Sequence, residues 1–150
     1  MAHYDLLVIG SGPAGQKAAI QAAKIGKTVG IIEKKKVAGG ICINTGTIPS
    51  KSLREAVMFL SGFRQRNLYG ASYRVKKAIT FDDLAIRCNH VIKAEQEVIQ
   101  NQLVRNSVDF ITGEASFIDP HRIAVALDVD VDEQTADYIV IAVGTECAAP

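Results

Sequence analysis

The chain has 150 residues, of which 48% are hydrophobic and 22% charged, a composition typical of a globular domain with a real core. Its 17 Lys and Arg residues against 16 Asp and Glu residues leave a net charge of +1, which gives no electrostatic reason to expect a nucleic-acid partner or an anionic membrane. No apolar run approaches the roughly 20 residues of a membrane span. We therefore expect a cytoplasmic protein with no nucleic-acid or membrane partner.

The cysteines and histidines of the chain do not form a metal-binding pattern. The three cysteines are an odd number without C-x-x-C spacing, which argues against a disulfide framework and against a zinc site. No histidine has a partner at metal-ligand spacing. We expect reduced thiols and no metal. The residues concerned are Cys42, Cys88, Cys147, His3, His90 and His121.

The first motif lies near the N-terminus. Leu6–Ile9 is an apolar run that predicts a buried parallel strand, and it ends in the hexapeptide Gly10-Ser11-Gly12-Pro13-Ala14-Gly15. This is a complete GxGxxG, in which the first glycine permits a tight turn, the second admits a pyrophosphate, and the third lets a helix pack on the strand. The helix that begins at Pro13 and Ala14 would direct its N-terminus toward the anion.

A second predicted strand, Thr28–Ile32, leads to Glu33. An acidic side chain at this position can accept hydrogen bonds from both ribose hydroxyls of an adenosine, and its charge would repel a 2′-phosphate. Glu33 therefore favours FAD or NAD over NADP. In the basic stretch that follows, we assign only the backbone at Lys34 to the cofactor. The alternative for Glu33 is a solvated strand end. The alternative for the glycine motif is a loop that binds nothing.

The segment from Gly39 to Lys51 reads GGICINTGTIPSK. The glycine pair would let a backbone approach a flat ligand, and Pro49 suits the start of a helix that carries Lys51. In this segment the chain resembles the flavoprotein disulfide reductases of the pyridine nucleotide-disulfide oxidoreductase family, whose pattern is G-G-x-C-x-x-x-x-C-x-P-x-K. Cys42 occupies the first cysteine position of that pattern, but Thr47 occupies the second.

The resemblance implies FAD as the bound cofactor and assigns roles to particular residues. Lys51 would stabilise the reduced flavin, and Cys42 and Thr47 would lie near the flavin without forming a redox disulfide. Gly39 and Gly40 would pack against the isoalloxazine. The remaining cofactor contacts that the resemblance implies, through the backbone, are Ala115 near the adenine and Gly144 in a turn that reads Ala142-Val143-Gly144 where the family has A-T-G.

Helical periodicity predicts two further helices. The first follows Lys51, carries an apolar face of Leu53, Ala56, Val57 and Leu60, and ends near Gly62. The second, of about six turns, starts at a capping box formed by Thr80 and Asp83 and buries Cys88 as a small hydrophobe. We expect a connecting loop between them, from Arg64 to Lys77.

From Val108 onward the pattern has a period of two, which predicts antiparallel strands through Val131. Asp128, Asp130 and Asp132 read as outward charges on an edge hairpin. Residues 138–143 then predict a fully buried strand. Together these elements indicate an α/β fold: a Rossmann-like FAD-binding domain with a parallel sheet, helices and an inserted antiparallel β-meander.

The resemblance further implies that residues 1–150 form the N-terminal part of a FAD-binding domain, without the nicotinamide and dimerisation domains of the full-length protein. It also implies that the full-length protein is a homo-oligomer. Lacking the second cysteine, that protein would carry out FAD-dependent hydride transfer between NADPH/NADP and NAD/NADH. The alternatives are an NAD(P)H-dependent quinone or dye reductase, a dihydrolipoamide dehydrogenase-like flavoprotein without the redox disulfide, and, for the isolated chain, a non-enzymatic nucleotide-binding module.

Overall fold

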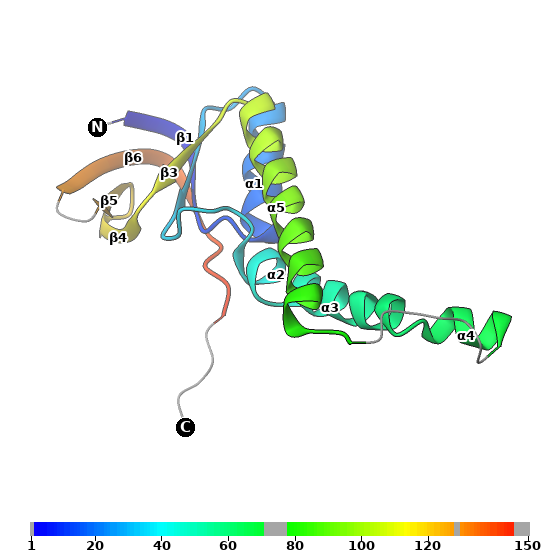
Figure 1. The fold of residues 1–150 in the computed structure, drawn as a ribbon. Helices are drawn as coiled ribbons and strands as arrows, with labels where there is room; N and C mark the ends of the chain where they lie inside the picture. The colour runs from blue at the N-terminus through cyan, green and yellow to red at the C-terminus, as the bar shows by residue number, and fades with distance from the viewer. Residues whose placement is uncertain (1, 71–77, 128–129, 146–150) are drawn as a thin grey trace. The chain divides into compact units, whose positions relative to one another are not determined.

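The computed structural model describes residues 2–70, 78–127 and 130–145 (Figure 1). The chain forms two compact units, one made of Met1–Ile41 and Gln96–Pro150 and the other of Cys42–Glu95. The elements, in chain order, are β1 (Ala2–Ile9), α1 (Pro13–Lys24), β2 (Val29–Glu33), α2 (Gly40–Asn44), α3 (Thr47–Leu60), α4 (Phe63–Tyr69), α5 (Phe81–Arg105), β3 (Val108–Thr112), β4 (Glu114–Asp119), β5 (Arg122–Leu127) and β6 (Asp130–Ile141).

The first unit is built on one six-stranded sheet with the order β3-β2-β1-β6-β5-β4. The strands β3, β2, β1 and β6 run parallel to one another, whereas β4, β5 and the first half of β6 form an antiparallel meander. The predicted α/β fold with a parallel sheet and an inserted meander is therefore confirmed.

The two central strands bury nearly all of their side chains, as the apolar runs predict. Leu7 and Val8 of β1 are fully buried, and β2 is buried at every position. Leu7 and Ile32 pack with Ile123 and Val125 of the meander. Val8 faces the opposite way, toward α1, because its Cγ1 would lie 3.2 Å from a Cβ added to Gly15. The parallel strands are thus covered on both faces, which explains their apolar sequence.

The strand β3 differs from the prediction. Phe110 and Thr112 were expected in an antiparallel strand, but β3 pairs with β2 in parallel. The helix α5 precedes β3, and a helical crossover connection typically joins two parallel strands. As an edge strand, β3 is only partly buried, so it lacks the continuous apolar run that marks a central parallel strand.

The meander confirms the predicted antiparallel pairing but corrects two details. The hairpin of β5 and β6 is interior, since β4 forms the edge, so Asp130 and Asp132 do not mark an edge hairpin; Asp128 lies outside the described residues. The strand β6 is not fully buried, because Tyr138 is 74% and Ile141 64% exposed. Within the described residues, β5 pairs only with Asp130–Thr135, so the second half of β6 has β1 as its one neighbour.

The second unit is helical. The expected loop from Arg64 to Lys77 is wrong over its first part, because α4 occupies Phe63–Tyr69; residues 71–77 lie outside the described residues. Gly62 takes a left-handed conformation that separates α3 from α4, and Gly70 ends α4. The polar composition of α4 concealed a short helix, and none of its residues is buried.

The capping box at the start of α5 is confirmed. The backbone N–H of Thr80 donates to the Asp83 carboxylate over 2.9 Å, and the Asp83 N–H donates back to Thr80 Oγ1 over 3.3 Å. The helix then runs for 25 residues, about seven turns rather than six. On α3, Ala56 is buried as predicted, whereas Leu53 and Val57 are 37% and 43% exposed. No described helix is both long enough and apolar enough to traverse a bilayer.

Candidate functional site

The dinucleotide loop between β1 and α1 has a shape that two of its glycines make possible. Gly10 has φ +102°, and a Cβ there would lie 2.4 Å from the carbonyl oxygen of Ala142. A Cβ on Gly15 would lie 1.9 Å from the carbonyl oxygen of Gly10. Both contacts are far shorter than van der Waals distance, so no larger residue fits without moving the backbone. These glycines serve the chain's own packing.

Gly12 is different, because a Cβ there would meet nothing within 4 Å. It is the N-cap of α1 in an extended conformation that any residue can adopt. Pro13 follows as the first helical residue and has no N–H, while Ala14 and Gly15 carry N–H groups that a helix cannot satisfy internally. The open space beside Gly12 therefore lies at a helix end with free donors and a favourable dipole for an anion.

Glu33, at the end of β2, is a buried carboxylate with an exposed fraction of 9%. Its Oε2 accepts hydrogen bonds from the Ser11 N–H over 3.0 Å and from the Ser11 hydroxyl over 2.6 Å, and its Oε1 accepts the Lys35 N–H over 3.1 Å. Burial would raise the pKa of Glu33, but these hydrogen bonds outweigh it and hold the pKa below the ordinary value. Glu33 is therefore a charged group at the edge of the dinucleotide loop.

Two residues of this site were missed at the level of sequence. Ser11 is fully buried, and Gln16 is 7% exposed and donates from Nε2 to the Ser11 carbonyl over 2.6 Å. A serine at the second position of the GxGxxG, followed by an acidic residue at the end of the next strand, was the available signal. Ser11 occupies an unspecified position of the GxGxxG motif, so a comparison of the glycines alone overlooks it.

Gly39 and Gly40 also lie at the dinucleotide loop. The Gly39 N–H donates to the Ser11 carbonyl over 3.1 Å, and Gly40, with φ +61°, would place a Cβ 2.9 Å from the Gly12 Cα. Gly40 is thus required by a close approach to the loop, and the predicted approach of the glycine pair to a flat ligand stays a prediction. Lys34 is exposed, and the backbone N–H that reaches Glu33 comes from Lys35.

Ala115 and Gly144 lie on segments that the sheet brings to this end of the unit. The Gly113 N–H donates to the Glu33 carbonyl over 2.9 Å, which holds the start of β4 beside the end of β2; Ala115 is half-buried against the core. The Ala142 N–H donates to the Ile9 carbonyl over 2.8 Å, next to Gly10. Gly144 follows with φ +76° and an open side.

The second unit carries the residues predicted to act on the flavin. Cys42 is a half-buried free thiol in α2, Thr47 is the first residue of α3, and Lys51 is exposed on the same helix. Thr47 and Lys51 are four residues apart, so they lie on one face of α3. Pro49 is the third residue of the helix, where the lack of an N–H costs no helical hydrogen bond.

Cys88 is buried, as predicted, and its Sγ lies 3.6 Å from the Pro49 carbonyl oxygen, within hydrogen-bonding distance for a thiol. Cys147 lies outside the described residues. Across the part of the chain that the structure describes, no three His, Cys, Asp or Glu side chains are grouped to hold a metal ion.

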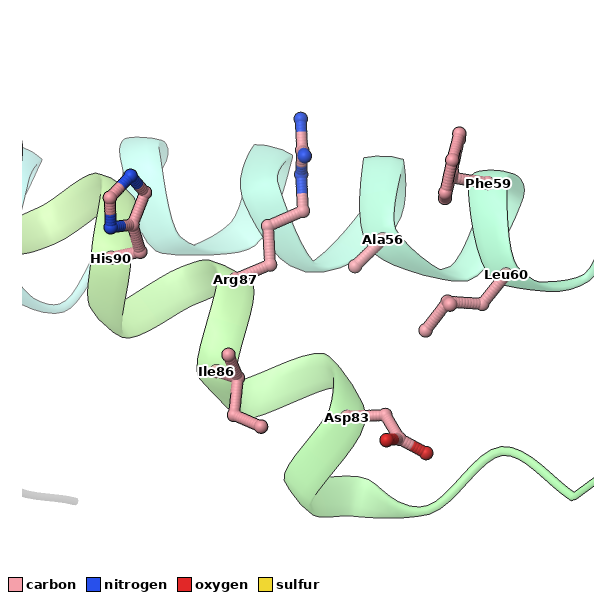
Figure 2. Close-up of a pocket in the computed structure, with 7 residues that line it drawn as sticks. All are labelled: Ala56, Phe59, Leu60, Asp83, Ile86, Arg87 and His90. Atoms are coloured by element: carbon pink, nitrogen blue, oxygen red, sulfur yellow. The ribbon is translucent and has the colours of Figure 1, made fainter. Parts of the chain in front are cut away.

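A pocket of about 320 Å³ lies between α3 and the first half of α5 (Figure 2). Figure 2 shows the side chains of both helices around it, and none belongs to the predicted site. Near the pocket, Arg87 forms an exposed ion pair with Glu55 at 3.6 Å. The lining residues are Ala56, Phe59, Leu60, Asp83, Ile86, Arg87 and His90.

Comparison with known families places these features in one context. The profile described as pyridine nucleotide-disulphide oxidoreductase matches residues 4–150. The chain belongs to this family. The GxGxxG, the acidic residue that ends β2 and the Cys42 segment all fall within the matched residues.

Curated relatives share a common name. The chain is 57% identical over its whole length to the soluble pyridine nucleotide transhydrogenase of Mycobacterium bovis (strain BCG / Pasteur 1173P2), of which it covers 32%. It is 41% identical, over 99% of its length, to the protein of that name from Photorhabdus laumondii, again covering 32% of it. The chain thus spans about a third of the length of these relatives.

Among solved structures, the chain is similar to the Cu(II) complex of the HOCl-induced flavoprotein disulfide reductase RclA from Escherichia coli. The TM-score is 0.80 at 28% sequence identity, and the match covers 100% of this chain and 30% of that one. The fold is therefore that of flavoprotein disulfide reductases.

Proposed function

We propose that this chain is the FAD-binding portion of an enzyme that transfers hydride between NADPH/NADP and NAD/NADH. The relatives that share 57% and 41% of its residues bear the name soluble pyridine nucleotide transhydrogenase, which supports this substrate pair. The missing second cysteine supports it as well, because Thr47 has no thiol through which electrons could pass to a disulfide substrate. Residues 1–150 are the N-terminal part of the FAD domain.

The observation that carries the proposal is the open space beside Gly12, which lies at the N-terminus of α1 and in the same loop as the groups that hold Glu33. A pyrophosphate at Gly12 would accept hydrogen bonds from the N–H groups of Ala14 and Gly15. Glu33 would accept a hydrogen bond from the adenosine ribose. The residues present therefore fit a dinucleotide cofactor, and the family match makes FAD the cofactor we assign.

When bound, FAD supplies the two-electron chemistry by taking hydride from one nicotinamide and giving it to another. The chain's own residues bind and orient it: the loop from Gly10 to Gly15 binds the pyrophosphate, and Gly39 and Gly40 support the flavin end. Ala115 contributes backbone near the adenine, and Gly144 allows a close approach. Lys51 favours negative charge on the flavin through its ammonium group.

The whole protein binds nicotinamide nucleotides as its substrates, acts as a homo-oligomer and works in the cytoplasm. The names of the relatives, which are about three times as long as the chain, support the nicotinamide substrates; the homo-oligomer and the cytoplasmic location are proposed from the family resemblance alone. Because the chain spans only about a third of the length of these relatives, we expect the isolated 150 residues to bind FAD weakly and to show no turnover.

The test uses the purified full-length protein. A yellow protein with flavin absorbance, which reduces an NAD analogue with NADPH in the absence of any disulfide, is the expected result. Colourless protein that stays without flavin after incubation with FAD would remove the cofactor from the proposal. Fast reduction of quinones or dyes, without nicotinamide-to-nicotinamide transfer, would replace the activity with that of a quinone reductase.

A further inference from the structure

Ser11 is fully buried, and the structure gives each of its polar groups a partner. Its N–H and its hydroxyl both donate to Glu33 Oε2, over 3.0 and 2.6 Å. Its carbonyl accepts hydrogen bonds from Gln16 Nε2 over 2.6 Å and from the Gly39 N–H over 3.1 Å, and the same N–H lies 3.3 Å from its Oγ. One small side chain thus connects the dinucleotide loop, the end of β2 and the Gly39–Gly40 turn.

We propose that Ser11 is a positioning residue that keeps the Glu33 carboxylate charged and oriented for the ribose of the dinucleotide, and that ties this carboxylate to the Gly39–Gly40 turn. The inference rests on the proposed FAD-binding function and adds a residue outside the glycines of the motif. Gln16 supports it by holding the Ser11 backbone from α1.

The hydrogen bonds determine which carboxylate oxygen of Glu33 is left to accept a hydrogen bond from a ligand. A carboxylate has about two lone pairs on each oxygen. Oε2 receives two hydrogens from Ser11, while Oε1 receives one from Lys35 and keeps one lone pair. Oε1 is therefore the atom that meets the ribose, and it has room for one hydroxyl. The sequence pattern alone predicted that Glu33 accepts both.

The Ser11 hydroxyl also affects protonation. Burial opposes the charge on Glu33, and the hydrogen bonds from Ser11 are the largest effect in the opposite direction. Lys35, in the loop after β2, acts on the Glu33 carboxylate through its charge and its N–H, whereas Ser11 contributes uncharged donors. The Gly113 N–H bonds the Glu33 backbone carbonyl instead. Loss of the hydroxyl would raise the pKa of Glu33, so the charged form that binds ribose would be lost at a higher pH.

The test measures FAD dissociation constants of the full-length protein between pH 4 and 8 for the wild type and for Ser11→Ala, Glu33→Gln and the double variant. We expect Ser11→Ala to weaken binding about 10-fold, the effect of a hydrogen bond to a charged group. The pH at which affinity declines should move upward in Ser11→Ala. In the Glu33→Gln background, Ser11→Ala should change affinity less than about 3-fold, because the two residues act together.

Ser61→Ala is the matched control, since its hydroxyl donates to the Met58 carbonyl in the other unit, and it should leave FAD affinity unchanged. Thermal unfolding shows whether each variant is folded; if Ser11→Ala is not, Ser11→Gly and Ser11→Cys take its place. Equal losses with and without Glu33, or an unchanged pH midpoint, would overturn the inference while FAD binding stands. Failure of the wild type itself to bind FAD would overturn the proposed function, and the role of Ser11 with it.

Discussion

The dinucleotide loop and the Cys42–Lys51 segment both match family motifs, but the chain builds them in different ways. In the loop, the backbone crowds Gly10 and Gly15 so closely that a methyl group would overlap a carbonyl oxygen. In the Cys42–Lys51 segment, Lys51 is exposed and Cys42 is half-buried. Residues needed for backbone shape thus reveal their role in the chain's own contacts. The proposed roles of Lys51 and Cys42 depend instead on a bound flavin, so the chain's own contacts do not reveal them.

The largest effect should come from the glycine that the fold itself requires. Gly15→Ala forces a Cβ to within 1.9 Å of the Gly10 carbonyl oxygen, and we expect a loss of about 3 kcal/mol in the free energy of unfolding. Gly12→Ala is the matched variant, because its Cβ would enter open space. It should cost less than about 1 kcal/mol, as an N-cap change does, yet weaken FAD binding at least about tenfold. Urea unfolding and FAD titration separate the two effects, and equal destabilisation by both variants would contradict the distinction.

Glu33→Ala should come next. It removes the acceptor for the proposed ribose hydroxyl and for three protein donors, and we expect FAD binding to weaken by about 1.5–3 kcal/mol. The exposed Glu97 on α5 provides the control, since Glu97→Ala removes the same charge far from these donors along the chain. An FAD dissociation constant that is the same in both variants would remove Glu33 from the ribose site.

A pH-dependent effect is expected at the far end of β1. The Tyr4 hydroxyl donates to Asp109 over 3.1 Å, and burial, followed by the Asp109 charge, raises the pKa of Tyr4 from 10.0 to about 12. Between these values the unfolded chain loses a proton that the folded chain keeps, so stability should fall as pH rises from about 10 to 12. Thermal unfolding across this range should show a shallower decline in Tyr4→Phe; an identical decline would mean that other groups cause it.

The capping box of α5 should have a smaller effect, confined to the helical unit. Asp83→Ala removes the acceptor for the Thr80 N–H and hydroxyl, and we expect a loss of about 1 kcal/mol in stability. Asp82→Ala is the neighbouring control, because it takes an acidic residue from the same turn without that acceptor role. Hydrogen exchange at the start of α5 measures the difference, and equal exchange in the two variants would argue against the cap.

The smallest effect concerns Cys42. With Thr47 in place of a second cysteine, the full-length protein should take up two electrons per flavin in a reductive titration, and Cys42→Ser should leave that number at two. Thr47→Cys should raise it to four by permitting a disulfide with Cys42, and it thus serves as the positive control. Four electrons per flavin in the wild type would show that another thiol takes part, and would place the protein with its disulfide-reducing relatives.

Much of the fold was predictable because it depends on local patterns. The run that ends at Gly10, the helix start at Pro13 and the buried strand before Glu33 are all written in neighbouring residues. The capping box of Thr80 and Asp83 is equally local. In each case a contact within a few residues, or the burial of a short apolar run, decides the structure.

The dinucleotide motif, the class of fold and the family were thus determined by the sequence itself, since close spacing of glycines and apolar residues restricts the backbone directly. Only the tertiary structure decided that β3 is parallel and that the second half of β6 is partly exposed, because both depend on which strands lie alongside. It also decided that Ser11 holds Glu33. That contact joins residues 22 positions apart, and a serine hydroxyl has no preferred partner until folding brings a buried carboxylate within 2.6 Å.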